Sequence, residues 1–232
     1  NKPVIAIKAG RSPDNPLMGV SDPLFLEMPN LVSHDDVHDA ALRRAGILRV
    51  DQLEEMFGAA ETVLRARPLR GNRLVVLSNG GGAGLMVEDS LYLAGYSLPA
   101  LKEQTIERLR RFMSPAWNGR NPLEIRVDSE PACYERLLKI LQEERDGDAV
   151  LLIHTPNALS SSIDTAQQVI ATARETGINL MTCWVGDESV EKERNLFINA
   201  GIATFDSPEH AASAFLHMHR HRIASEVLME VP

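Results

Sequence analysis

The residues with the clearest potential for chemistry are 78–84, which read Ser-Asn-Gly-Gly-Gly-Ala-Gly. They stand between an apolar run at 74–77 and a helix-like pattern over 85–94. Glycines between a strand and a helix let the backbone turn sharply and let an anion approach closely. The helix N-terminus then offers unpaired N–H groups and a partial positive charge. The natural guest is a phosphate, a phosphoryl group or a carboxylate.

We therefore predict an anion site in this glycine turn, with no catalytic side chain assigned. The phosphate-binding residues are predicted to be Asn79, Gly80, Gly81, Gly82, Ala83 and Gly84. The spacing is neither a dinucleotide fingerprint, because no acidic ribose ligand stands at the right distance, nor a P-loop, because no Gly-Lys-Ser/Thr follows. The alternative is a tight turn that binds nothing.

Two histidine pairs have helical spacing that could suit a metal ion. His34 and His38 flank "HDDVH", and His217 and His221 flank "HMHRH". The first pair lies at a predicted helix N-terminus, where acidic residues are favourable for electrostatic reasons, and the second lies at a basic helix C-terminus. The first pair has no evident third ligand, and the second is more simply explained as the polar, basic end of a helix, so we predict no metal site.

Residues at the ends of two predicted strands are further candidates for a site. His154 and Thr155 come after the run at 149–153, and Cys183 with Trp184 ends the run at 180–184. Ligands of open α/β sheets gather at the carboxyl ends of strands. These four residues are secondary site candidates, and the alternative is a buried cysteine beside a polar strand-end turn.

Continuous apolar runs alternate with helical patterns along the chain. Runs of this kind suit parallel strands that are covered on both faces. The predicted strands are 4–7, 74–77, 149–153 and 180–184, and the predicted helices are 36–45, 52–66, 85–94, 103–112, 132–144, 164–175, 190–200 and 209–221. This alternation predicts an α/β fold with doubly wound, flavodoxin-like parallel sheets.

An internal repeat divides the chain. "RRAGILRVDQLEEMF" and "INAGIATFDSPEHAASAF" each read as a helix ending in Ala-Gly, a short strand, an Asp and a new helix. We predict a first domain at 1–68, which is the C-terminal half of one subdomain, and a complete subdomain at 69–232. The chain lacks an initial Met and opens in a strand-like run, so we expect a fragment. A long loop at 11–32 has an apolar tip, Leu24-Phe25-Leu26, which suggests docking.

Composition excludes several classes of protein. A net charge of −8 argues against nucleic-acid and membrane-surface partners, which require clustered Lys and Arg. No apolar run is long enough to cross a bilayer, and no signal peptide precedes the first strand-like run. The two cysteines, Cys133 and Cys183, form neither a disulfide framework nor a metal motif. We therefore expect a cytoplasmic protein.

Several motifs, in order, resemble one family. "NGGGAGLMVEDSLYLAG" is similar to the glycine turn and following helix of the C-terminal domain of the succinyl-CoA synthetase β-subunit. "KPVIAIKAGRS", "DDVHDAALRRAGILRVDQLEEMF", "NPLEI" and "DAVLLIHTPNAL" resemble NDP-forming (ADP-forming) acyl-CoA synthetases, and the likeness runs from Lys2 to about Ala212. "RPLRGNRLVVLSNG" and "AFLHMHRHR" look closest to the synthetase-like region of Pat-type bacterial protein lysine acetyltransferases.

The resemblance implies a mechanism. In that family an acyl-CoA and phosphate give an acyl phosphate, and the phosphoryl group moves to a loop histidine and then to ADP. Two helix N-termini stabilise the phosphohistidine, and one of them would be the helix after residues 79–84. The family's histidine lies in a Ser-His-Thr-Gly segment, whereas the corresponding loop here holds only His34, with His38 one turn later. We therefore predict that the phosphohistidine segment is lost.

Three functions follow as hypotheses. The first is the synthetase-like module of a Pat-type acetyltransferase, acting as an acyl-CoA-responsive regulatory or scaffold region. The alternatives are a catalytic part of an ADP-forming acyl-CoA synthetase, using His34 or a rearranged loop, and a structural assembly domain. We do not expect the fragment alone to complete the reaction.

The resemblance also implies ligands and partners. The fragment itself needs no cofactor, whereas the full-length protein would use CoA or acyl-CoA and ATP or ADP with Mg. Its partners would be the CoA-binding and ATP-grasp domains of the same protein and a phosphate or phosphoryl group. A homo-oligomer is compatible with the sequence.

Overall fold

The computed structural model describes residues 3–9 and 35–229, and it forms two compact units. The larger unit runs from Glu61 to Leu216, and the smaller one combines the residues up to Ala60 with those from His217 onward. Helices α4 (Leu53–Arg65) and α10 (Pro208–Met229) therefore each begin in one unit and end in the other. No helix among the described residues is long and apolar enough to span a bilayer.

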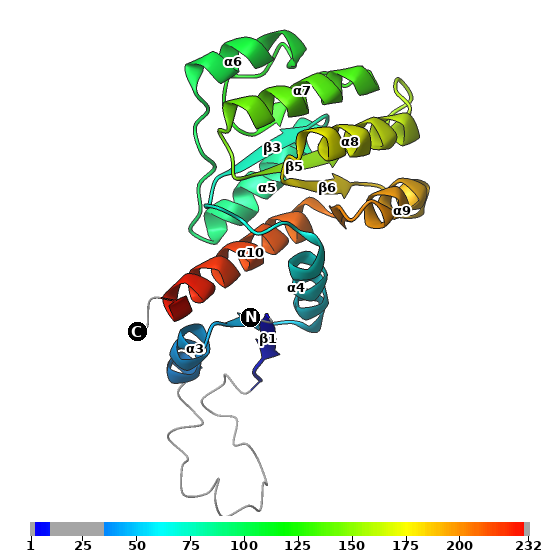
Figure 1. Cartoon of the computed structure of the whole chain (residues 1–232). Helices are drawn as coiled ribbons and strands as arrows, with labels where there is room; N and C mark the ends of the chain where they lie inside the picture. Colours follow the sequence, from blue (N-terminus) through cyan, green and yellow to red (C-terminus); the bar gives the residue numbers. More distant parts are fainter. Residues whose placement is uncertain (1–2, 10–34, 230–232) are drawn as a thin grey trace, which may run out of the picture. The chain divides into compact units, whose positions relative to one another are not determined.

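A five-stranded parallel sheet forms the centre of the larger unit (Figure 1). Its strands are β3 (Leu74–Ser78), β4 (Leu123–Glu124), β5 (Ala149–His154), β6 (Leu180–Trp184) and β7 (Ala203–Phe205). Its helices are α5 (Gly81–Leu93), α6 (Glu103–Leu109), α7 (Pro131–Glu144), α8 (Ser162–Thr176), α9 (Glu191–Asn199) and the first part of α10. Short 3-10 helices lie at Arg110–Phe112 and Asp187–Val190.

The strand order β4-β3-β5-β6-β7 explains where a ligand could enter. From β3 the chain first moves to one side, to β4, and then returns to build β5, β6 and β7 on the other side. Figure 1 shows α7 and α8 on one face of the sheet and α5 on the other. Since the order reverses between β3 and β5, the helices that follow these strands diverge and leave a crevice at their carboxyl ends.

The core of the larger unit is apolar and continuous. Every residue of β3, β5 and β6 is buried, which explains why these strands appear in the sequence as unbroken apolar runs. Leu137 and Leu141 of α7 and Val169 of α8 are buried in the same cluster as Leu77 and Leu152. This packing holds the strand ends rigidly enough to present a site.

The smaller unit pairs two short parallel strands, β1 (Val4–Ile7) and β2 (Ile47–Val50). The same unit contains helix α3 (Asp35–Arg44), the first part of α4 and the last part of α10. Its small core holds Leu48, Val50 and Ala59. The order α3-β2-α4 repeats as α9-β7-α10, and β6 pairs in parallel with β7 as β1 does with β2. The internal repeat predicted from the sequence is therefore present.

The structure confirms the predicted fold class and corrects several element boundaries. Helix α5 begins at Gly81 rather than at residue 85, α10 continues to Met229 rather than ending at 221, and the two-residue strand β4 was not predicted. The loop at 11–32, with its apolar tip, lies outside the described residues, as does His34. The division at residue 68 into two domains stays a prediction.

Candidate functional site

The glycine turn forms the N-terminus of α5 directly after β3. Gly80 is the N-cap in an extended conformation (φ −129°, ψ 105°), and its carbonyl accepts hydrogen bonds from the N–H groups of Ala83 (3.0 Å) and Gly84 (3.4 Å). The Gly80 N–H donates to the Ser78 hydroxyl at 3.1 Å. The N–H groups of Gly81 and Gly82 have no acceptor among the described residues. They are the first free donors of the helix, where its dipole favours an anion.

Asn79 locks the turn to the neighbouring strand. Its side-chain amide donates to the Thr155 carbonyl (2.9 Å), and its side-chain oxygen accepts from the Thr155 N–H (2.7 Å). Asn79 is only 6% exposed, whereas Thr155 is exposed. These two bonds join the ends of β3 and β5, the two strands between which the sheet order reverses. The glycine turn therefore lies at the ligand-binding crevice expected for this topology.

Lack of space for a Cβ explains three of the four glycines of the turn, Gly80, Gly81 and Gly84. A Cβ at Gly80 would come within 2.9 Å of the Thr155 hydroxyl, and one at Gly84 within 3.1 Å of the Pro122 ring. A Cβ at Gly81 would lie 2.9 Å from the Glu124 carboxylate, whereas one at Gly82 would meet nothing within 4 Å. The open approach to the helix N-terminus is therefore over Gly82.

A cavity of about 200 Å³ lies beside this helix end. It is lined by Ser78 and Gly81 from the turn and by Arg120, Pro122 and Glu124 from the segment leading into β4. Glu124 and Ser78 pair across the β3–β4 ladder, so the carboxylate stands at the same edge as the turn. An anion next to Gly81 would be repelled by Glu124, while Arg120 supplies the positive charge of this cavity.

Asn121 holds the β4 segment in place. Its side-chain oxygen accepts from the Val76 N–H (2.9 Å), and its amide donates to the Leu74 carbonyl (2.8 Å). Asn121 is buried, so it satisfies backbone groups of β3 where the very short β4 offers none. Arg120, Asn121 and Glu124 were not predicted from the sequence. The "NPLEI" segment at 121–125 was the available signal for Asn121 and Glu124, and none pointed to Arg120.

His154 does not line the crevice, which corrects the first of the secondary candidates. Its side chain is fully buried, with Nδ1 3.1 Å from the Tyr134 hydroxyl and its ring stacked on Trp184 at 4.8 Å between centroids. Burial lowers the pKa of His154 to about 4, against a smaller opposing effect of Glu193. His154 is therefore a neutral core residue.

Cys183 and Trp184 are also buried and reach no crevice. Burial raises the pKa of the Cys183 thiol to about 12, so this thiol is unreactive in the folded chain. Of the four secondary candidates, only Thr155 lies at the glycine turn. In the described part of the chain, no group of three His, Cys, Asp or Glu side chains is arranged to hold a metal ion.

Comparison with known proteins gives consistent matches over nearly the whole chain. Residues 1–63 match the model of the succinyl-CoA ligase like flavodoxin domain, and residues 74–228 match that of the Ligase-CoA domain. The chain is 30% identical, over 92% of its length, to acetate–CoA ligase [ADP-forming] I of Archaeoglobus fulgidus, covering 29% of that protein. It is 28% identical to the α-subunit of acetate–CoA ligase [ADP-forming] II of Pyrococcus furiosus, covering 92% of the chain and 46% of the subunit.

A solved structure shows the same likeness. The apo form of dinucleotide-forming acetyl-coenzyme A synthetase 1 from Ca. Korarchaeum cryptofilum superposes with a TM-score of 0.83 at 25% identity. That match covers 100% of this chain and 49% of the solved one. The chain thus spans less than half the length of each of these three relatives.

Proposed function

Because this chain belongs to the NDP-forming acyl-CoA synthetase-like family, we propose that it is part of an ADP-forming acyl-CoA synthetase. In this proposal its glycine turn receives an anionic reacting group, either a phosphoryl group or a carboxylate. The observation that carries the proposal is the pair of free N–H groups, of Gly81 and Gly82, at the strand-order reversal.

Each residue of the turn has a proposed role. Gly81 and Gly82 donate backbone N–H groups to the anion, and the N-terminal turn through Ala83 and Gly84 supplies the dipole. Gly80 allows close approach to Thr155, and Asn79 positions the turn through its two bonds to that residue. The chain would thus stabilise a negatively charged group by preorganised donors, without itself forming a covalent bond through these residues.

The rest of the reaction depends on groups outside these residues. CoA or acyl-CoA and ADP or ATP with Mg are proposed ligands of the full-length protein, held by its CoA-binding and ATP-grasp domains. The ligase names of the relatives support this reading. A cytoplasmic location is proposed from cysteine usage alone.

The Pat-type regulatory module remains the second hypothesis, and one sequence feature favours it. The family's Ser-His-Thr-Gly segment is missing here, and His34 and His38 are the only histidines near that position. The relatives reported above are ligases, and none of their names refers to an acetyltransferase.

Phosphorylation of the full-length protein separates the two hypotheses. We would incubate it with γ-labelled ATP and measure acid-labile, base-stable label on this region, with His34→Ala and His38→Ala variants. Label that disappears in one of these variants supports the synthetase. No label on a folded, nucleotide-binding protein supports the regulatory module.

The role of the turn is tested by Gly82→Asp, with Gly82→Asn as the matched neutral control. Gly82 is exposed with open space around its Cβ, and an acid in the first turn favours the helix, so Gly82→Asp should fold. Its carboxylate would compete with the bound anion, and ligase activity should fall at least about tenfold relative to Gly82→Asn. Equal activity of the two variants would rule out anion binding at this turn.

A further inference from the structure

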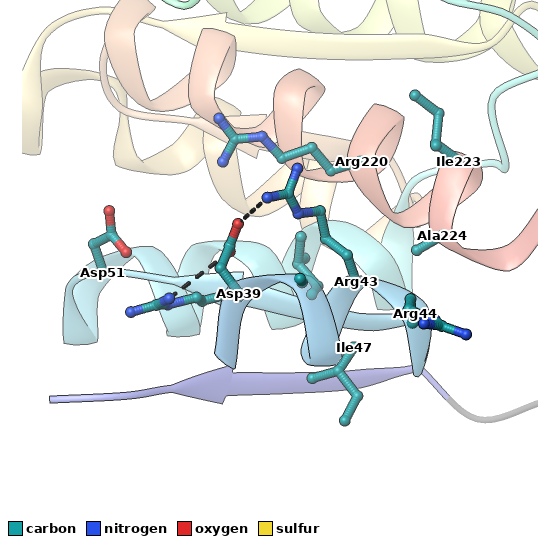
Figure 2. A pocket seen from close by; sticks show the side chains of 11 residues that line it. Asp39, Arg43, Arg44, Ile47, Asp51, Arg220, Ile223 and Ala224 are labelled. Atoms are coloured by element: carbon teal, nitrogen blue, oxygen red, sulfur yellow. Dashed lines mark hydrogen bonds and ion pairs between the residues drawn. The ribbon is translucent and has the colours of Figure 1, made fainter. Parts of the chain in front are cut away.

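The smaller unit contains a cavity of its own, but its free positive charges lie apart. The cavity has a volume of about 710 Å³, and Arg44 and Arg220 are the guanidinium groups of its lining that form no ion pair with another described residue. Figure 2 shows these two side chains toward opposite ends of the cavity, with Arg43 paired to Asp39. They do not converge on one anion, so the glycine turn of the larger unit remains the better anion site.

The glycine turn has one feature that a simple anion site would not have, an unpaired carboxylate. The Glu124 side chain lines the cavity of about 200 Å³ at the N-terminus of α5, and a Cβ placed on Gly81 would lie 2.9 Å from its carboxylate. In the described part of the chain, no hydrogen bond or ion pair engages this carboxylate, and Arg120 lines the same cavity without pairing to it. An anion bound at Gly81 would therefore have a negative charge beside it.

The backbone fixes the position of Glu124. It stands in register with Ser78 across the β3–β4 ladder, and its carbonyl accepts a hydrogen bond from the Ser114 N–H at 2.8 Å. The next residue, Ile125, donates its N–H to the Ser78 carbonyl at 2.9 Å. Because Gly81 has no side chain, the half-buried carboxylate packs directly against the turn. Glu124 is therefore a fixed part of the site.

The chemistry of a carboxylate decides which anion it tolerates. An ionised carboxylate only accepts hydrogen bonds. It repels an anion that carries no proton, whereas it forms a charge-assisted hydrogen bond with an anion that offers an O–H group. Hydrogen phosphate offers such a group at neutral pH, and neither sulfate nor a carboxylate does. A site that combines N–H donors with a carboxylate therefore discriminates between anions of the same shape.

We propose that Glu124 determines which anion the glycine turn accepts, by accepting a hydrogen bond from a protonated oxygen of that anion. The turn then favours hydrogen phosphate over sulfate and over a carboxylate, and the N–H groups of Gly81 and Gly82 donate to the other phosphate oxygens. This inference rests on the anion site proposed above, and it narrows the anion, left open there, to one that carries a proton. Arg120 adds attraction for every anion and no selectivity.

The test is an NMR titration of the 232-residue chain with phosphate, arsenate and sulfate at pH 7 and constant ionic strength. It follows the amide signals of Gly81 and Gly82, so that binding at the turn is observed directly. Phosphate should shift both signals saturably, and sulfate should bind at least about tenfold more weakly because it has the same shape and no proton. Arsenate carries a proton as phosphate does and should bind like phosphate.

The decisive variant is Glu124→Gln, which removes the charge with almost no change in shape. Its amide can donate to an anion without a proton. Sulfate should therefore bind at least about tenfold more tightly than to the wild-type chain, and the preference for phosphate should disappear. Glu88→Gln is the matched control, because Glu88 is half-buried and lines the same cavity, about 10 Å along the α5 axis from Gly81 at about 1.5 Å per residue. This variant should keep the preference for phosphate.

Three results would overturn the proposal. Equal affinity of the wild-type chain for phosphate and sulfate would refute the role of Glu124 and leave the anion site standing. Loss of the preference in Glu88→Gln to the same extent would refute it too, since negative charge in general would then explain the preference. If neither anion shifts the Gly81 and Gly82 signals, in the wild-type chain or in Glu124→Gln, the anion site itself is wrong and the role of Glu124 falls with it.

Discussion

The buried histidine of the larger unit makes folding stability depend on pH in a way that can be measured. His154 has no exposed surface, its Nε2 has no hydrogen-bond partner in the described structure, and its pKa is lowered from 6.5 to about 4 by burial. The unfolded chain therefore binds a proton on this residue between about pH 6.5 and pH 4, whereas the folded chain does not. Stability is fully present above pH 6.5 and is lost as the pH falls through this window.

The size of the effect follows from the shift. A difference of 6.5 − 4 = 2.5 pKa units corresponds to an upper limit of about 3–4 kcal/mol, at about 1.4 kcal/mol per unit. Most of that loss, about 2–3 kcal/mol, should appear between pH 7 and pH 4.5. This is a large fraction of the stability of an ordinary domain, about 5–15 kcal/mol.

Urea unfolding, followed by tryptophan fluorescence, is the appropriate assay. Both tryptophans, Trp117 and Trp184, lie in the larger unit, so the signal reports on that unit alone. The control is the double variant His154→Phe with Tyr134→Phe, which removes both partners of one buried hydrogen bond and so leaves neither unsatisfied.

Apart from His154, the double variant keeps every group that titrates between pH 4.5 and pH 7, so its pH dependence measures the background. The wild-type chain should lose about 2–3 kcal/mol more than the double variant between pH 7 and pH 4.5. Parallel pH profiles for the two proteins would refute the reasoning, because they would show that His154 accepts a proton in the folded chain as easily as in the unfolded one.

Two further predictions concern buried groups of the same unit. Asn121→Ala should destabilise the larger unit by about 2–4 kcal/mol in the same urea assay at pH 7, because it leaves the Val76 N–H and the Leu74 carbonyl without partners inside the core. If the Asn121→Ala variant were as stable as the wild-type chain, water would have to replace the two hydrogen bonds of the Asn121 side chain. Cys183 should not react with a thiol reagent until urea unfolds the chain, whereas half-buried Cys133 should react first. Rapid labelling of two thiols in native protein would contradict the burial of Cys183.

The sequence predicted the sheet well because its strands are buried on both faces. Runs such as 149–153 and 180–184 are apolar throughout, and this pattern alone distinguishes parallel strands from half-exposed ones. The start of α5 was predicted too late, at residue 85, because glycine is a poor helix former and four of the first residues around the turn are glycines. Glycine is nevertheless required in this first turn, because Pro122, Glu124 and Thr155 lie too close to its backbone to leave room for a Cβ.

The candidate site could be predicted only in part, because residues far apart in the sequence come together in it. The glycine turn is a local signal, but the partner of Asn79 is Thr155, 76 residues later. Glu124 reaches the same edge through its register with Ser78, which no local pattern encodes. His154 was expected at the crevice because it ends a strand, yet Tyr134 and Trp184 enclose it, and neither is near it in sequence.

The strand order of the sheet explains both the open crevice at the glycine turn and the closed carboxyl end of β6. Beyond β5 the chain continues in a single direction, and the end of β6 is sealed by the stack of His154, Trp184 and Phe197, with ring centroids 4.8 and 4.6 Å apart. The order reverses between β3 and β5, and at this point the N–H groups of Gly81 and Gly82 at the N-terminus of α5 have no acceptor among the described residues. The packing that buries His154, and so lowers its pKa, therefore also fills the carboxyl end of β6. Disrupting these ring contacts should consequently change stability more than anion binding. The turn is held by the hydrogen bonds between Asn79 and Thr155, and these bonds do not involve the rings.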